Sequence, residues 1–195
     1  MTELVIGIFV GGAGSRMGGV AKGLLAAPSG SETLLSRLLR ICAQAAPTAE
    51  RCLVGRATDY ADLGLLALAD EPSGVGPIGG LRALLLHAQR TNAEKVLVLA
   101  CDLPFLEQSV LARLLQPSSH AARVPRFEGH LQPLAAVYRT APTLRAVDAA
   151  LADQQHALRQ VLERLGDTVE VLDFFGVAGR ALDDWDSPED MRRDH

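Results

Sequence analysis

The feature that most constrains the fold of this 195-residue chain is a continuous apolar run that leads into glycines. The run Leu4–Val10 shows no alternation, which is typical of a strand buried on both faces of a parallel sheet. Gly11-Gly12-Ala13-Gly14-Ser15-Arg16 follows directly, and Lys22 comes shortly after. Because glycine lacks a Cβ atom, its backbone N–H can approach phosphate oxygens closely. The pattern predicts an α/β fold with a ligand site after its first strand.

Two common phosphate-binding loops do not account for this stretch. A P-loop requires Gly-x-x-x-x-Gly-Lys-Ser/Thr, but Lys22 lies between Ala21 and Gly23. The dinucleotide fingerprint Gly-x-Gly-x-x-Gly has Met17 where its last glycine belongs, and the acidic ribose anchor that should end the next strand is missing. Arg16 and Lys22 add two positive charges to the backbone donors, which suits a triphosphate better than a neutral ligand.

Composition limits the classes of protein to which the chain can belong. With 48% hydrophobic residues it can bury one substantial core, and we expect residues 1–195 to form a single domain. No apolar run approaches the roughly 20 residues of a membrane span, and no secretory signal is recognisable. A net charge of −4 without a basic block argues against nucleic-acid binding. The three scattered cysteines favour buried thiols in a reducing, cytoplasmic protein.

A second buried run places a carboxylate where a ligand is expected. Lys95–Ala100 is apolar after its first residue and leads into Cys101-Asp102-Leu103-Pro104. Pro104 ends the strand, so Asp102 should lie at the carboxyl end of it. In an open parallel sheet this edge is where ligands bind. We therefore expect Asp102 near the glycine loop, and its neighbours in sequence offer its charge no partner.

Another glycine-rich stretch follows a third apolar segment. Leu63–Ala69 reads as a strand that ends in Asp70, and glycines and prolines forbid regular structure until about Gly79. A helix is then expected over 81–89. Gly79 and Gly80 at its start would let a ligand approach unpaired N–H groups.

The rest of the chain indicates helices alternating with strands, without repeats or a linker. We expect one doubly wound, mainly parallel sheet with helices on both faces. Apolar spacing predicts further helices over 34–45, 109–115, 140–151 and 156–165, and further strands over 52–55, 121–124, 131–139 and 168–174. Ser187 and Pro188 are typical of the start of a final helix.

The glycine stretch resembles the nucleotidyltransferase signature Leu-Ala-Gly-Gly-x-x-x-Arg-Met-Gly-x-x-Lys. It reads Phe9-Val10-Gly11-Gly12, then Arg16-Met17-Gly18, then Lys22, with an altered opening pair and Ala21 at a position that is often acidic. The sequence is more narrowly similar to the molybdenum cofactor guanylyltransferases. Their other motifs appear here in the same order, as Gly76-Pro77-Ile78-Gly79-Gly80, Cys101-Asp102-Leu103-Pro104-Phe105, Gln132-Pro133-Leu134 through Tyr138, and Asp184-Trp185-Asp186-Ser187-Pro188-Glu189-Asp190.

The resemblance implies a Rossmann-like nucleotidyltransferase that moves GMP from GTP onto molybdopterin carrying molybdenum and releases pyrophosphate. It implies Mg²⁺ as cofactor, held by Asp102, with Asp184 or Asp186 as a candidate second carboxylate. It also implies contacts with proteins of cofactor synthesis and with recipient molybdoenzymes. Catalytic roles fall on Arg16, Lys22 and Asp102; acceptor contacts on Gln132, Pro133 and Tyr138; and nucleotide contacts on Phe9, Val10, Gly11, Gly12, Gly14, Ser15, Arg16, Lys22, Asp70, Gly79, Gly80 and Asp102.

Several alternative functions share these motifs. Relatives that use CTP tend to have Ala-Ala-Gly in the first loop, so Gly11-Gly12 favours GTP. A molybdopterin cytidylyltransferase and a cobinamide-phosphate guanylyltransferase remain the nearest alternatives. A non-catalytic nucleotide-binding cofactor chaperone is the alternative of another class, although the chain keeps both Lys22 and Asp102. A dinucleotide-dependent oxidoreductase is disfavoured by the failed fingerprint.

Overall fold

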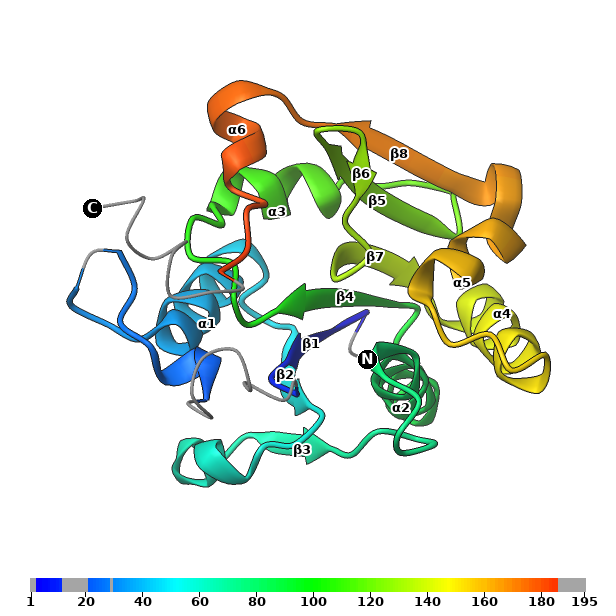
Figure 1. Cartoon of the computed structure of the whole chain (residues 1–195), viewed down its shortest axis with the longest axis horizontal. Helices are drawn as coiled ribbons and strands as arrows, with labels where there is room; N and C mark the ends of the chain where they lie inside the picture. Colours follow the sequence, from blue (N-terminus) through cyan, green and yellow to red (C-terminus); the bar gives the residue numbers. More distant parts are fainter. Residues whose placement is uncertain (1–2, 12–20, 29, 186–195) are drawn as a thin grey trace.

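The structure is a computed structural model that describes residues 3–11, 21–28 and 30–185. These residues form one eight-stranded mixed sheet with helices on both of its faces (Figure 1). The strands lie in the order β3-β2-β1-β4-β7-β5-β6, and β8 pairs with β5. The predicted α/β architecture is confirmed.

The first part of the sheet is entirely parallel, and we call it the parallel half. β1 (Leu4–Phe9) lies between β2 (Glu50–Val54) and β4 (Lys95–Ala100), and β3 (Leu66–Leu68) pairs with β2 at the edge. All six residues of β1 are buried. Helices cover both faces of this strand, which explains why its sequence is apolar without alternation.

The second part of the sheet is mixed, and we call it the mixed half. β7 (Ala135–Arg139) runs antiparallel to β4, and β5 (Ala122–Phe127) runs antiparallel to β7. The short β6 (His130–Leu131) forms a hairpin with β5, and β8 (Val169–Asp173) runs parallel to β5. Because β7 is antiparallel to both β4 and β5, β5 runs in the same direction as β4 and β1, and β8 does as well. The carboxyl ends of all four strands therefore lie along one edge.

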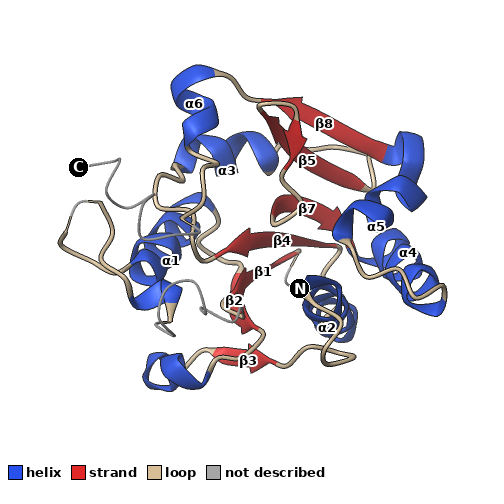
Figure 2. Ribbon diagram, in the orientation of Figure 1, coloured by secondary structure: helices blue, strands red, loops and turns tan. Residues whose placement is uncertain are grey.

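The helices divide between two hydrophobic layers, one on each face of the sheet (Figure 2). One layer packs against Val5 and Phe9 of β1, and the other packs against Ile6 and Ile8. The first layer contains α2 (Pro77–Arg90), α4 (Thr140–Ala152) and α5 (Leu158–Leu165), and the second contains α1 (Leu34–Ala45) and α3 (Gln108–Leu114). Short turns of helix complete the described chain: η2 (Lys22–Leu24), η3 (Thr58–Leu63), η4 (Gly166–Thr168) and α6 (Gly176–Arg180).

Several predicted boundaries were wrong for identifiable reasons. Helix α2 begins at Pro77, four residues before the predicted start, because proline is well suited to the first helical position. The predicted strand over 63–69 is reduced to β3, and η3 occupies the residues before it. The predicted strand over 131–139 is split into β6 and β7, because Pro133 cannot donate a ladder hydrogen bond. The expected final helix begins beyond residue 185 and lies outside the described residues.

The cysteines are free and buried, as predicted. Burial raises the pKa of the thiols of Cys42, Cys52 and Cys101 to about 12, so all three remain protonated at neutral pH. Among the described residues, no helix combines the length and apolarity that crossing a bilayer would require.

Candidate active site

The ends of β1 and β4 bring the first two predicted motifs together. The N–H of Cys101, just beyond β4, donates to the carbonyl of Phe9 at the end of β1 (3.1 Å). The N–H of Val10 donates to the carbonyl of Val54 in β2 (3.0 Å). The start of the glycine loop and Asp102 therefore lie side by side at the carboxyl edge of the sheet. Phe9 itself is buried beneath α2, so its side chain supports the loop from within the core.

Lys22 and Asp102 form an ion pair at this edge. The Nζ of Lys22 lies 2.7 Å from Oδ2 of Asp102, and the two side chains are only 20% and 16% exposed. Asp102 has no charged partner among its neighbours in the sequence. Its partner is Lys22, which lies 80 residues away in the chain. Because both groups are largely withdrawn from solvent, removing Lys22 would leave the charge of Asp102 poorly compensated.

A buried tyrosine positions Lys22, and sequence reasoning missed it. The N–H of Gly23 donates to the hydroxyl of Tyr60 in η3 (3.1 Å), and Tyr60 is 3% exposed. A Cβ atom on Gly23 would lie 2.9 Å from that hydroxyl, so only glycine fits there. Burial raises the pKa of Tyr60 to about 12, which keeps its hydroxyl neutral. The hydroxyl fixes the backbone next to Lys22.

Gly11 lies against a second loop that also carries an acidic residue. A Cβ atom on Gly55, which has a φ of +95°, would lie 2.9 Å from the Cα of Gly11 and 3.7 Å from Oδ1 of Asp70. The residues that follow β1, β2 and β3 thus meet in one corner. Desolvation raises the pKa of the Asp70 carboxyl above its ordinary value. Sequence reasoning placed Gly55 only in a strand, although its left-handed backbone makes this contact possible.

Gly79 and Gly80 have a packing role that differs from the predicted one. Both lie in the first turn of α2 and are buried. A Cβ atom on Gly80 would lie 2.8 Å from side-chain atoms of both Phe9 and Val54, and 3.0 Å from Oδ1 of Asp70. The Gly-Gly pair therefore lets the helix approach the sheet closely. The Asp70 carboxylate lies against the same turn of the helix.

The predicted acceptor segment adjoins β4 near Asp102. The N–H of Ala100 donates to the carbonyl of Leu134 (2.7 Å), which places Gln132 and Pro133 close to the same edge. Tyr138 is 1% exposed, and its hydroxyl donates to the carbonyl of Pro133 (2.8 Å). The prediction that Tyr138 contacts an acceptor is therefore corrected, because its side chain lies in the core and supports this segment from below.

The end of the described chain returns to Asp102. The N–H of Trp185 donates to the carbonyl of Asp102 (3.0 Å), and its ring packs edge-on against Phe105 with centroids 6.2 Å apart. Trp185 is 2% exposed and its neighbour Asp184 is exposed. The predictions for Gly12, Gly14, Ser15, Arg16 and Asp186 concern positions outside the described residues.

The donor set at Asp102 is compatible with Mg²⁺. No group of three or more metal-ligating side chains occurs among the residues that the structure describes. Mg²⁺ is usually bound through only one or two carboxylates, together with substrate phosphates and water, so an all-protein cluster is not required. Asp102 supplies one hard oxygen ligand beside the loop that is expected to bind phosphates.

Comparison with known proteins identifies the family. Residues 6–169 match the family described as the MobA-like NTP transferase domain. The chain belongs to this family. It is 32% identical over 190 residues to the molybdenum cofactor guanylyltransferase of Rhodobacter capsulatus, covering 95% of this chain and 92% of that protein. It is also 32% identical over 161 residues to the one from Xanthomonas euvesicatoria, covering 80% and 78%. The chain is thus a nucleotidyltransferase, as predicted.

Solved structures share the fold. Molybdopterin-guanine dinucleotide biosynthesis protein A from Archaeoglobus fulgidus aligns with a TM-score of 0.73 and 22% identity, covering 97% of this chain and 95% of that one. The 2-C-methyl-D-erythritol 4-phosphate cytidylyltransferase from Thermus thermophilus aligns with a TM-score of 0.70 and 22% identity, covering 99% and 97%. Their similarity supports the predicted Rossmann-like nucleotidyltransferase architecture of this family member.

Proposed function

We propose that this protein transfers GMP from GTP to the phosphate of molybdopterin that carries molybdenum, and releases pyrophosphate. The observation that carries the proposal is the Lys22–Asp102 ion pair at the edge where the glycine loop begins. A lysine and a carboxylate at this edge suit the phosphates of a nucleotide and their metal ion. The Rhodobacter capsulatus relative, which matches nearly the full chain, is named molybdenum cofactor guanylyltransferase.

The reaction requires alignment more than it requires a protein nucleophile. An oxygen of the acceptor phosphate forms a bond to the α-phosphorus of GTP, the bond to the oxygen bridging to the β-phosphorus breaks, and pyrophosphate leaves with that oxygen. The acceptor oxygen is already anionic at neutral pH, so no general base is needed. The thiol of Cys101, with its pKa raised to about 12, is correspondingly unsuited to nucleophilic attack at neutral pH.

Lys22 and Asp102 can exchange their mutual contact for contacts with substrate. Lys22 would bind the phosphates of the nucleotide and stabilise the departing pyrophosphate, and Asp102 would hold Mg²⁺. Neither charge is then left uncompensated when the pair opens. Bound Mg²⁺ would supply neutralisation of the phosphate charge. The backbone from Val10 onward would bind phosphates and base, and Asp70 would face the ribose and base.

The location and partners form part of the same proposal. Three free, buried cysteines are usual in a reducing compartment, which supports the cytoplasm. The product has to reach enzymes that use it, so recipient molybdoenzymes and proteins of cofactor synthesis are the expected protein partners.

The test is incorporation of nucleotide into molybdenum cofactor with GTP, CTP or ATP, each with and without Mg²⁺. We expect Mg²⁺-dependent product from GTP and much less from CTP. Equal or better use of CTP would assign the protein as a cytidylyltransferase. Transfer to cobinamide phosphate but not to molybdopterin would assign the protein as a cobinamide-phosphate guanylyltransferase. Nucleotide binding without any turnover would favour a non-catalytic cofactor chaperone.

A further inference from the structure

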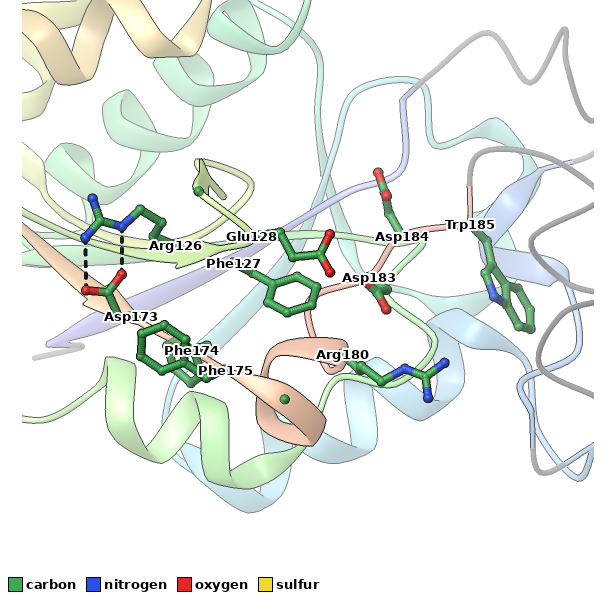
Figure 3. Close-up of a pocket in the computed structure, with 12 residues that line it drawn as sticks. Arg126, Phe127, Glu128, Asp173, Phe174, Phe175, Arg180, Asp183, Asp184 and Trp185 are labelled. Carbon is green, nitrogen blue, oxygen red and sulfur yellow. Dashed lines mark hydrogen bonds and ion pairs between the residues drawn. The ribbon is translucent and has the colours of Figure 1, made fainter.

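A cavity of about 720 Å³ lies in the mixed half, separate from the predicted acceptor segment. It opens between the β5–β6 hairpin, the end of β8, α6 and the last described residues (Figure 3). Its volume is within the roughly 300–1,000 Å³ typical of small-molecule sites. None of Lys22, Asp102, Gln132 and Pro133 lines it.

The topology places this cavity on the same edge as the candidate active site. It begins at Phe127 and Asp173, the last residues of β5 and β8, which point in the same direction as β1 and β4. Ligands bind beyond the carboxyl ends of parallel strands. At its other end the cavity is lined by Trp185, whose N–H is bonded to the carbonyl of Asp102 (3.0 Å). It therefore extends the active-site edge from Asp102 toward the mixed half.

Aromatic surface lines part of the cavity. Phe175 lines it with a side chain that is 78% exposed, an unusually open position for a phenylalanine. Phe127 is braced from behind, since a Cβ atom on Gly179 of α6 would lie 2.2 Å from its ring. Phe174 has a different role, because it is buried with the guanidinium of Arg113 4.4 Å from its ring centre. Flat apolar faces of this kind suit a planar ring system.

The polar lining is acidic in balance. Its charged residues are four carboxylates and two arginines. Arg126 is occupied by both oxygens of Asp173 (2.6 and 3.0 Å), and this pair lies at the end of the cavity away from Trp185 (Figure 3). Asp183, Asp184 and Arg180 lie toward Trp185 in the same view. Asp183, Asp184 and Arg180 each have contacts of their own, so recognition of a ligand here rests on Glu128. A carboxylate accepts hydrogen bonds, which suits a ligand with N–H donors better than a phosphate.

Glu128 is the carboxylate best placed to make such a contact. It forms the hairpin turn with Gly129, and both residues have positive φ, 49° and 81°. A turn with two positive φ values tightly joins antiparallel strands and so fixes where the Glu128 side chain begins. Glutamate is an unusual choice for this backbone conformation, for which Asn, Asp or Gly are preferred. Glu128 makes no hydrogen bond or ion pair with any other described residue.

We propose that this cavity binds the ring system of the acceptor, and that the ring is a flat nitrogen heterocycle with a 2-amino-4-oxo edge, as in a pterin. Phe175 and Phe127 stack on the ring, and Glu128 accepts hydrogen bonds from the 2-amino and ring N–H groups. The acceptor phosphate then reaches back past Trp185 to Asp102. The inference rests on the proposed function for the identity of the reaction. It differs from the sequence prediction, which placed the acceptor at Gln132, Pro133 and Tyr138.

The first experiment measures binding of two small probes to the full-length protein by calorimetry. Pterin carries the 2-amino group, and lumazine has an oxygen in its place. We expect pterin to bind about tenfold more tightly than lumazine, the scale of a lost charge-assisted hydrogen bond. Saturating GTP should not displace pterin. Displacement would mean that pterin occupies the guanine position. Equal affinity for the two probes would contradict recognition of the 2-amino group by Glu128.

The second experiment uses variants with matched controls. Phe175→Ala should weaken pterin binding about tenfold, the scale of a lost aromatic stack, whereas Val171→Ala on the exposed side of β8 should not. Glu128→Gln keeps the size of the side chain and the turn geometry, and should remove the preference for pterin over lumazine. Glu163→Gln on α5 is its control. GTP affinity should stay unchanged in all four variants.

Steady-state kinetics separate this inference from the proposed function. With molybdenum cofactor as acceptor, Phe175→Ala and Glu128→Gln should raise KM for the acceptor about tenfold and leave KM for GTP unaltered. Transfer that proceeds normally in both variants would overturn the cavity assignment and leave the proposed function standing. Pterin binding with no transfer from any nucleotide would overturn the proposed function and leave the cavity as a pterin site.

Discussion

The parallel half and the mixed half contribute to the same edge of the sheet by different means. In the parallel half, β1 and β4 end beside each other, and Lys22 and Asp102 meet within 2.7 Å. In the mixed half, β5 and β8 end around a cavity of about 720 Å³ whose lining comes from a hairpin, a short helix and the last described residues. The first arrangement supplies two fixed charges, which suit the triphosphate of the proposed nucleotide substrate. The second provides a shaped space, which is the part of a transferase that has to differ between acceptors.

This contrast makes a separable prediction for each half. Changes near Lys22 and Asp102 should alter nucleotide binding and turnover without altering recognition of the acceptor ring. Changes around the cavity should do the reverse. The following variants test the nucleotide side, and the variants of Phe175 and Glu128 test the other.

Asp102→Asn should have the largest effect. It preserves the shape of the side chain and removes the charge that would hold Mg²⁺, so turnover should fall by roughly 10²-fold or more. GTP binding measured by calorimetry should lose its Mg²⁺-dependent part, whereas pterin binding should be retained. Glu163→Gln, a surface carboxylate paired with Arg159, is the control. A variant that melts earlier yet turns over normally per folded molecule would reduce Asp102 to a structural residue.

Lys22→Ala should come next. The loss of one charge-assisted contact should weaken GTP binding by about 1.5–3 kcal/mol and guanosine binding hardly at all, because the proposed contact of Lys22 is with the phosphates. Lys95→Ala is a suitable control, since Lys95 begins β4 at the opposite edge and pairs with Glu3 (3.5 Å). Equal losses for GTP and guanosine would show that Lys22 shapes the loop without contacting phosphate.

Tyr60→Phe tests whether the Tyr60 hydroxyl positions Lys22 through the backbone of Gly23. Loss of the hydroxyl leaves the buried N–H of Gly23 without its acceptor, which should cost about 1–3 kcal/mol in the free energy of unfolding. KM for GTP should rise several-fold while KM for the acceptor stays constant. Thr140→Val removes another buried hydroxyl, which bonds to the carbonyl of Ala93 (2.7 Å), and should destabilise without changing either KM. The same KM pattern in both variants would argue against a positioning role for Tyr60.

Asp70→Asn should have the smallest effect on stability and a revealing pH dependence. Desolvation raises the folded-state pKa of Asp70, so the folded protein binds the proton more readily than the unfolded chain. The ionised carboxylate therefore begins to destabilise the fold as the pH rises past the ordinary carboxyl pKa, and the full cost is present once the pH exceeds the raised folded-state pKa. Asparagine should raise stability at neutral pH by less than about 1 kcal/mol, since Asp70 is partly exposed and solvent screens it.

Thermal melts across the acidic range check the sign of this prediction. The advantage of Asp70→Asn should shrink as the pH falls through the folded-state pKa and vanish below the ordinary carboxyl pKa. GTP affinity should fall in the same variant. A constant stability difference at every pH would mean that the carboxyl's charge is not its cause.

The parallel half was predictable because its rules are local and topological. A buried apolar run followed by a glycine or an aspartate identifies a strand end, and parallel strand ends meet at one edge. That reasoning brought Lys22 and Asp102 to the same place. It could not reveal their direct pairing, nor the hydroxyl of Tyr60 beneath Gly23, because both contacts depend on how η2 and η3 fold back over the sheet.

The cavity of the mixed half could not be predicted from the sequence, because short irregular segments form its lining. Helix α6 has only five residues, two of them glycine, so no periodic pattern identifies it. Phe175 lies one residue beyond the strand predicted over 168–174 and no sequence pattern singled it out, yet its side chain lines the cavity and is 78% exposed. Tyr138 reads as a contact residue, yet it is buried. The cavity forms where irregular segments meet in space. The residues that line it are spread over the chain from residue 126 to residue 185.

The tie between Trp185 and Asp102 has a practical consequence. Trp185 is the chain's one tryptophan, and its backbone is bonded to the residue expected to carry the metal. Its indole lies against Phe105 in a nearly dry environment, between the nucleotide edge and the proposed acceptor cavity. The protein thus contains its own optical reporter. Its ultraviolet emission should respond to occupancy on either side, so that each binding step can be followed in real time without a label.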